Sequence, residues 1–191
     1  MSDLTDRTIL ITGASRGIGY ETARVLGEAG SNVIAHYGGH REGAMDATAG
    51  IPEERKMIIQ ADLATPDAAA ALWNEAVAWR GRVDVVVNNA AIMPEVGIED
   101  AEADWEDALA AAFAINVMAP AVLIRLAAQH FIANGGGVLI TMSSWAAHRG
   151  SGNPKLAAYA ASKAALAAVT KTMARAHARD GVLGYCIAPG T

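Results

Sequence analysis

The chain has 191 residues, and its 15 lysines and arginines against 20 aspartates and glutamates give a formal net charge of -5. This length supports one domain with a substantial core, and the acidic balance argues against nucleic acid as a partner. Because Cys186 is the single cysteine, neither an internal disulfide nor a cysteine metal cluster is possible, and we expect no bound metal. The amino terminus, "MSDLTDRTIL", has no basic-then-apolar secretory pattern, which predicts a cytoplasmic protein.

Short apolar runs alternate with longer alanine-rich segments along the whole chain. The predicted elements are, in order, strand 7–12, helix 17–29, strand 31–36, helix 41–49, strand 56–61, helix 66–80, strand 83–88, helix 103–133, strand 137–143, helix 155–179 and strand 182–188. The strands are apolar throughout, as parallel strands covered on both faces require. The pattern predicts an α/β fold, a doubly wound parallel sheet (Rossmann-like) with helices on both faces.

The most apolar stretch, residues 108–128, is interrupted by Asn116, Pro120 and Arg125. It therefore predicts a buried or interface helix, and we expect no membrane span. Helices 103–133 and 155–179 carry more apolar surface than one face of a sheet can cover. Because large exposed apolar patches usually mark interfaces, these two helices predict a homo-oligomer.

Three glycines follow the first predicted strand, in "TGASRGIG" (12–19). Gly13 suits a tight turn, Gly17 lets the backbone approach a pyrophosphate, and Gly19 lets the helix close on the strand. Free amides at a helix start favour an anion. The spacing departs from G-x-G-x-x-G, so the turn is either a dinucleotide phosphate site or a purely structural turn.

Further motifs follow this turn in a fixed order. They are "ADL" with Asp62, "NNAA" (88–91), "INVMAP" with Asn116, "SS" (143–144), "LAAYAASKAAL" with Tyr159 and Lys163, and "APG" (188–190). Together with the glycine turn, this series resembles the short-chain dehydrogenase/reductase family over nearly the whole chain. The resemblance implies an oxidoreductase that moves hydride between a nicotinamide cofactor and an alcohol/carbonyl pair of a small-molecule substrate. It also implies dimers or tetramers built through helices 103–133 and 155–179.

Tyr159 and Lys163 are four residues apart and so share one face of a helix. A phenol, whose reference pKa is roughly 10, becomes a usable acid/base when a fixed ammonium stabilises its phenolate. Ser144 can hold the reacting oxygen by a hydrogen bond. The resemblance adds Asn116, which anchors a water leading to Lys163, and a contact of Lys163 with the nicotinamide ribose. The alternative is that the pair only packs, and that Asn116 only bonds to backbone.

The predicted cofactor-binding set follows the carboxyl ends of the strands. It comprises Gly13, Ser15, Arg16, Gly17, Ile18, Gly19, His36, Asp62, Leu63, Asn88, Ala90, Tyr159, Lys163, Pro189 and Gly190. His36 stands where an acid would accept from the adenosine ribose and repel a 2′-phosphate. Arg16, with His40 or Arg41 as helpers, could instead neutralise that phosphate. We therefore expect NADPH to be preferred, with NAD possible, unless Arg16 is merely a solvated loop residue.

The sequence departs from the family's pattern at three places. Ala91 stands where the family usually has glycine, and the long loop 144–159 holds His148 and Arg149, which either meet a polar substrate or face solvent. The chain stops at "APGT", so we expect residues 1–191 to form a single dinucleotide-binding domain without an ordered carboxyl-terminal substrate lid and last strand. Alternatives are a catalytically weak or inactive nucleotide-binding regulatory protein of the same fold and an isomerase or dehydratase of nucleotide-linked sugars, which typically needs a second domain.

Overall fold

The computed structural model describes residues 4–190, which are built around a sheet of six parallel strands in the order β3-β2-β1-β4-β5-β6. The strands are β1 (Thr8–Ile11), β2 (Asn32–Tyr37), β3 (Lys56–Gln60), β4 (Val85–Asn88), β5 (Gly137–Met142) and β6 (Val182–Ile187). Strand order reverses between β1 and β4, and ligands of such sheets bind outside the carboxyl ends of the strands at that reversal. The predicted doubly wound parallel sheet is confirmed.

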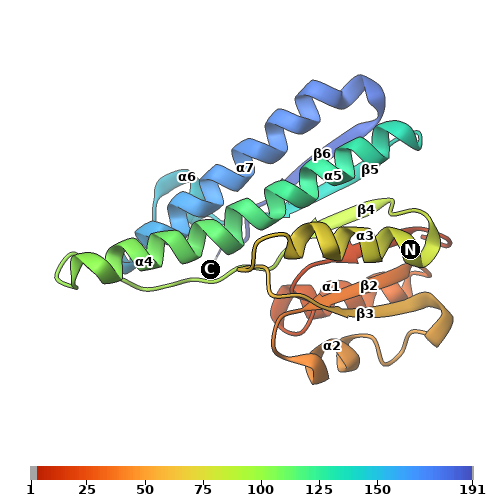
Figure 1. Cartoon of the computed structure of the whole chain (residues 1–191), viewed down its shortest axis with the longest axis horizontal. Coiled ribbons are helices and arrows are strands. Elements are labelled where there is room, and N and C mark those ends of the chain that lie inside the picture. The colour runs from red at the N-terminus through yellow and green to blue at the C-terminus, as the bar shows by residue number, and fades with distance from the viewer. Residues whose placement is uncertain (1–3, 191) are drawn as a thin grey trace.

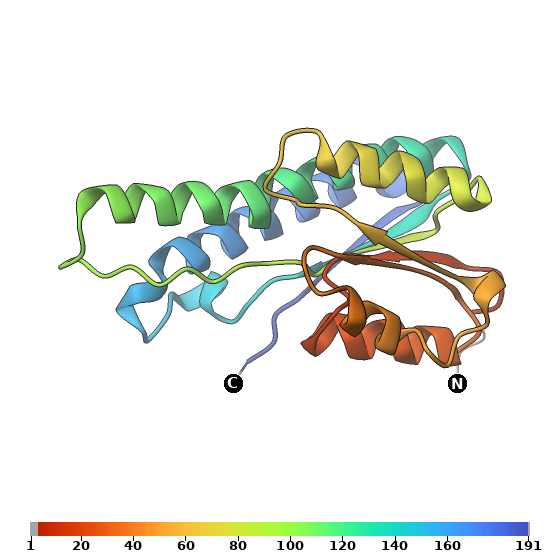
Figure 2. The same cartoon turned by 60° about the horizontal axis from the view of Figure 1, so that its bottom comes forward.

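Helices cover both faces of the sheet (Figure 1). They are α1 (Gly17–Glu28), α2 (Arg41–Ala47), α3 (Ala68–Arg80), α4 (Glu102–Phe113), α5 (Ala119–Ala133), α6 (Ala146–Arg149) and α7 (Ala157–His177). In Figure 2, α1 and α2 lie below the sheet, whereas α3 and α5 lie above it. The helix predicted over 103–133 is α4 and α5 joined by a π-helical turn, Ala114–Met118, and α6 lies inside the segment predicted as a loop.

Each face of the sheet has its own apolar core. On one face, Leu10 and Leu139 pack with α3, α5 and α7, where Phe131 is fully buried. On the other face, Ile11 packs with Ala23 of α1 and with residues of and near α2. Burying one such side chain contributes roughly 1.5–3 kcal/mol. Because successive residues of a strand point to opposite faces, both sets must be apolar, which explains the unbroken apolar runs.

The outer strand β6 is apolar on a face that solvent reaches. Leu183, Tyr185 and Ile187 are 48%, 55% and 47% exposed. The register places Tyr185 beside Ile140 of β5, which packs on the core of α1 and α2. These three residues therefore point to the α1 side of the sheet, and we call them the apolar face of β6.

The helical run Glu102–Ala133 has a mean hydropathy of 1.9 in its most apolar window, high enough for a membrane span by length and composition. In this fold part of it serves as a core helix, with Leu123 and Phe131 fully buried. Only 39% of that window is buried, and Met118 and Ile132 lie on the exposed surface of the helical run. The run therefore keeps apolar surface available for a further contact.

Candidate active site

The turn between β1 and α1 requires its glycines. Gly13 and Gly17 have φ values of 67° and 56°, in the left-handed region that other residues rarely adopt. A Cβ on Gly13 would lie 2.9 Å from the Cα atom of Ala90, and a Cβ on Gly19 would lie 2.2 Å from the carbonyl oxygen of Gly13. The turn is therefore in close contact with the segment after β4, and α1 closes directly onto it.

From the side of β4, the turn is held by Asn89. The Nδ2 atom of Asn89 donates to the carbonyl oxygens of Thr12 and Gly13, at 2.9 and 3.1 Å. In return, the Thr12 hydroxyl accepts from the amides of Asn89 and Ala90, at 3.0 Å each, and donates to the carbonyl of Val87. This network fixes the turn to the end of β4.

From the side of β2, the turn is held by His36, which is only 2% exposed. Its Nδ1 atom accepts from the amide of Gly13 at 3.1 Å, and its Nε2 atom lies 2.9 Å from the carbonyl oxygen of Ala61. An amide can only donate and a carbonyl can only accept, so the ring is neutral with its proton on Nε2. Burial lowers the pKa of His36, which favours the same neutral form.

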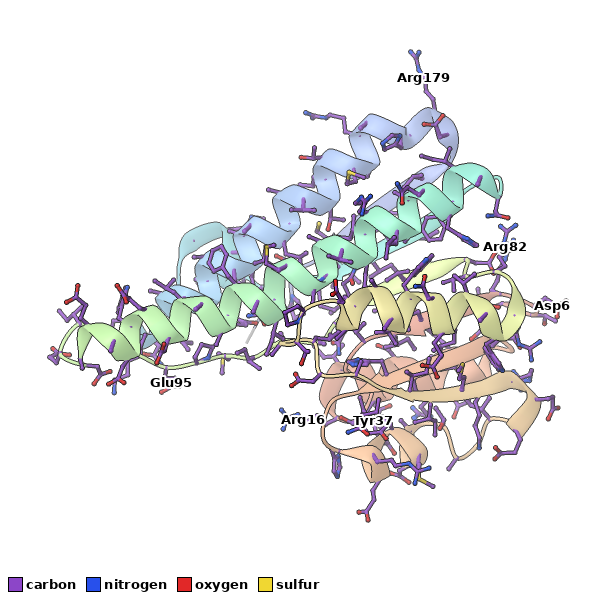
Figure 3. All side chains as sticks on the ribbon, viewed as in Figure 1. Asp6, Arg16, Tyr37, Arg82, Glu95 and Arg179 are labelled. Carbon is purple, nitrogen blue, oxygen red and sulfur yellow. The ribbon has the colours of Figure 1, made fainter. Side chains whose placement is uncertain are left out.

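The start of α1 offers backbone amides to a ligand. Within residues 4–190, the N-cap residue, Arg16, makes no side-chain hydrogen bond that caps the helix. The Arg16 side chain is exposed and projects outward from the carboxyl edge of the sheet (Figure 3). Free first-turn amides beside a guanidinium favour an anion, so this end of the site fits the phosphates of a dinucleotide.

A cavity of about 500 Å³ extends from the turn across the crevice between β1 and β4. Of the residues predicted to bind cofactor, it is lined by Gly13, Ser15, Arg16, His36, Asp62, Leu63 and Ala90. It is also lined by Gly38, Gly39, His40, Ala61, Asn89, Ala91, Ile92 and Ile115. The donors and the size of this cavity suit the adenosine and pyrophosphate parts of a dinucleotide.

Other predicted cofactor residues do not line the cavity. Gly17, Ile18 and Gly19 form the first turn of α1. Beyond β6, the carbonyl of Pro189 accepts from the amide of Trp145 at 3.2 Å, next to Ser144, and exposed Gly190 follows. Thr191, the last residue of "APGT", lies outside the described residues.

Of the two neighbouring asparagines at the end of β4, Asn89, which follows the strand, lines the cavity, and Asn88, the last residue of the strand, does not. Asn88 is 2% exposed, and within residues 4–190 its side-chain amide has no hydrogen-bond partner. Sequence reasoning selected Asn88 and missed Asn89. The alternation of β4 could have found it, because Asn89 shares its face with Val87, which packs on the α1 side.

The ammonium group of Lys163 is buried beside Tyr159. Lys163 is 3% exposed, and its Nζ atom donates to the carbonyl oxygen of Met142 at 2.7 Å. The same atom lies 5.8 Å from the centre of the Tyr159 ring. Burial lowers the pKa of Lys163 to about 8. The lysine is therefore directed at the end of β5 and not at solvent, whereas the phenol of Tyr159 is only half-buried.

Asn116 connects the cavity wall to the helix that carries Tyr159. It is fully buried in the π-helical turn, where its Oδ1 accepts from the amide of Ile92 at 2.8 Å and its Nδ2 donates to the Ile92 carbonyl at 2.8 Å. Nδ2 also donates to the hydroxyl of Ser162 at 3.0 Å, which donates to the carbonyl of Tyr159 at 2.8 Å. Sequence reasoning missed Ser162, although it lies three residues after Tyr159 and just before Lys163.

The two serines after β5 have different environments. Ser143 is buried, and its hydroxyl donates to the carbonyl of Lys163 at 3.4 Å. Ser144 is half-buried at the start of α6, and its Oγ accepts from the amide of Ala146 at 3.2 Å. An Oγ that accepts here keeps its proton free to donate, so Ser144 is the serine with a hydrogen bond to offer a ligand.

A family model described as short chain dehydrogenase matches residues 7–191. The chain belongs to the short-chain dehydrogenase family. Family members are oxidoreductases that use nicotinamide cofactors. This dehydrogenase is 34% identical over 192 residues to 3beta-hydroxysteroid dehydrogenase 1 of Eggerthella lenta, covering 98% of this chain and 71% of the relative. It is 34% identical over 187 residues to the 3-oxoacyl-[acyl-carrier-protein] reductase FabG of Staphylococcus aureus, covering 96% and 74%.

Solved structures agree with this assignment. This dehydrogenase is similar to acetoin dehydrogenase YohF from Salmonella typhimurium, with a TM-score of 0.87 at 28% identity, covering 98% of this chain and 73% of that one. It is also similar to a 7 alpha-hydroxysteroid dehydrogenase complexed with NADH and 7-oxo glycochenodeoxycholic acid, with a TM-score of 0.86 at 29% identity, covering 98% and 71%.

Replacing Ser162 by alanine tests the hydrogen-bond chain. Ser162→Ala removes the hydroxyl that donates to the carbonyl of Tyr159 and accepts from Nδ2 of Asn116. We therefore expect the free energy of unfolding to fall by about 1–3 kcal/mol. Urea unfolding measures the change. Thr22 is the control, because its hydroxyl bonds to a carbonyl four residues earlier on an exposed helix surface, and Thr22→Ala should change the free energy by less than about 0.5 kcal/mol. Equal effects of the two variants would contradict the assigned role of Ser162.

Proposed function

We propose that this chain is an NAD(P)-dependent oxidoreductase that transfers hydride between nicotinamide and an alcohol/carbonyl substrate, with Tyr159 as the acid/base. The observation that carries the proposal is the buried ammonium of Lys163 beside the Tyr159 ring, at the same sheet edge as the glycine turn. Burying an ammonium costs free energy, so its retention there favours a chemical role over a packing role.

When bound, a nicotinamide nucleotide supplies or accepts the hydride. Tyr159 gives its proton to the carbonyl oxygen during reduction and takes it back from the alcohol during oxidation. The Lys163 ammonium stabilises the phenolate left on Tyr159. Ser144 donates a hydrogen bond to the same substrate oxygen while charge develops on it. Asn116 and Ser162 orient the helix turn that carries Tyr159, because both are bonded to fixed backbone atoms.

We further propose a preference for NADPH, with NAD also accepted. Arg16 is exposed at the glycine turn, where a guanidinium pairs well with a phosphate, and His40 lines the same cavity. Near the end of β2, where an acidic residue would repel a 2′-phosphate, stands His36, and the cavity beyond it is lined by Gly38 and Gly39. Asp62, an acid that does line the cavity, follows β3, where we place the adenine.

We also propose that the enzyme is a cytoplasmic homodimer or homotetramer that pairs through the helices predicted over 103–133 and 155–179. The support is the partly buried apolar run Glu102–Ala133, on which Phe113 and Met118 are exposed. Apolar surface of this kind is costly to leave in water.

The acid/base role is tested with Tyr159→Phe, which removes one hydroxyl and keeps the ring. We expect turnover to fall by about 10²–10⁴-fold, because the proton donor is lost, while the dissociation constant for NADPH stays within about twofold. The measurement is NADPH oxidation over a panel of oxosteroid, 3-oxoacyl thioester and acetoin-type carbonyl substrates. Unchanged turnover in the variant would remove Tyr159 from the mechanism. Cofactor binding without turnover of any carbonyl by the unaltered enzyme would favour the non-catalytic regulatory protein.

Cofactor preference is tested with Arg16→Ala. We expect the dissociation constant for NADPH to rise about tenfold, the amount expected when one charge-assisted contact to phosphate is lost, and that for NADH to change little. Fluorescence titration of both cofactors measures the two constants. Arg41→Ala on the neighbouring helix start is the matched arginine control and should have the smaller effect. If Arg16→Ala weakens both cofactors equally, the arginine does not recognise the 2′-phosphate.

The assembly is tested by multi-angle light scattering at micromolar concentration. We expect a mass of two or four chains, and we expect Met118→Lys to lower it, because a charge in an apolar interface must be desolvated. A monomeric mass for the unaltered protein would contradict the proposed assembly. Lys substitution at exposed Met45 on α2 is the control and should leave the mass unchanged.

A further inference from the structure

Among residues 4–190, His36 is the one cavity-lining side chain that hydrogen-bonds the glycine turn through a ring able to titrate near neutral pH. Both of its nitrogens are used within the protein, Nδ1 by the amide of Gly13 and Nε2 by the carbonyl of Ala61. The His36 carbonyl also accepts from the amide of Ala14 at 2.8 Å. The residue thus ties the glycine turn to β2 and to the end of β3, and it has no nitrogen left for a ribose.

Protonation of His36 cannot leave this arrangement intact. A proton on Nδ1 would face the N–H of Gly13 across 3.1 Å, so two donors would oppose each other. The turn would have to move away from β2, and the amides that follow it would move with it. The charged or titratable side chains that line the same cavity are Arg16 of the turn, His40 before α2 and Asp62 after β3.

Within residues 4–190, none of these three side chains is hydrogen-bonded to the His36 ring or forms an ion pair with it. Its ring bonds are to backbone atoms, and the causes that act on its pKa are burial, which lowers it, and the bond to Ala61, which opposes the change. The imidazolium would therefore be buried without a counter-charge, which is costly.

We propose that His36 is a positioning residue for dinucleotide binding, which holds the glycine turn in its binding geometry only while the imidazole is neutral. This inference rests on the proposed function, because it assumes that the turn binds a pyrophosphate. The ring is neutral above its own pKa, which lies below the usual value of about 6.5. Dinucleotide affinity is therefore complete at neutral pH and falls as the pH drops through that pKa.

The test is calorimetric titration with ADP-ribose between about pH 5 and pH 8, the range in which histidine changes charge. ADP-ribose carries the pyrophosphate but no 2′-phosphate that would titrate in this range, and no nicotinamide. For the unaltered protein we expect the affinity to fall in acid, by at most about tenfold per pH unit for one coupled proton. Circular dichroism at each pH limits the titration to conditions in which the fold is intact.

The matched variants are His36→Asn and His40→Asn. In His36→Asn the side-chain oxygen can still accept from the amide of Gly13 but cannot titrate, so we expect binding that stays constant across the range. In His40→Asn an exposed histidine of the same cavity is removed, and the acid-induced loss should persist. If His36→Asn does not fold, His36→Gln serves in its place, since its longer amide reaches toward Ala61.

The outcomes separate this inference from the proposed function. Affinity of the unaltered protein that is constant or rises in acid would overturn the role of His36, and so would an acid loss that survives in His36→Asn. If ADP-ribose does not bind at pH 8, the proposed dinucleotide site itself is wrong. Loss of affinity in acid that only the His36 variants abolish would establish the role.

Discussion

The free amides at the start of α1 impose the strictest requirement on this structure. They can bind an anion only if the turn before them is fixed, yet that turn has two left-handed glycines and no side-chain cap from Arg16. The fold meets the requirement from both sides, with His36 of β2 and Asn89 after β4 each bonded to Gly13. Because strand order reverses at β1, its two neighbours reach the turn from opposite sides, and the crevice opens between them.

The alanine-rich composition of α7 serves the second half of the site. Small side chains let this helix approach the sheet closely, and a Cβ on Gly184 of β6 would lie 2.6 Å from the Cβ of Ala174. Elsewhere on the same helix, the Nζ atom of Lys163 donates to the carbonyl oxygen of Met142 of β5 and lies 5.8 Å from the centre of the Tyr159 ring. The burial that lowers the pKa of Lys163 also shields its charge from water, so the interactions of this ammonium are screened less than those of an exposed lysine.

The sequence predicts most elements well because the strands are largely apolar on both faces and most helices are long; the four-residue helix α6 was missed. An unbroken apolar strand does not reveal which way each side chain points. In β2 there is no alternation of polar and apolar residues, so the sequence suggested that His36 lies near the ribose. In the structure its ring faces the glycine turn. The π-helical turn could not be predicted either, because its one extra residue per turn leaves no composition signal. Asn116 was identified, but its partners Ile92 and Ser162 are 24 and 46 residues away and meet it only in the folded chain.

The apolar face of β6 is next to the segment that carries Ser144 in the candidate active site. Ile187, the last residue of that strand, accepts a hydrogen bond from the amide of Ser143, and Pro189 just beyond it is bonded to Trp145. Leu183 and Ile187 therefore expose apolar surface on the strand whose end is hydrogen-bonded to Ser143, the residue before Ser144. Covering this apolar surface would remove water from Leu183 and Ile187 and, at the same time, from the end of the strand beside Ser144.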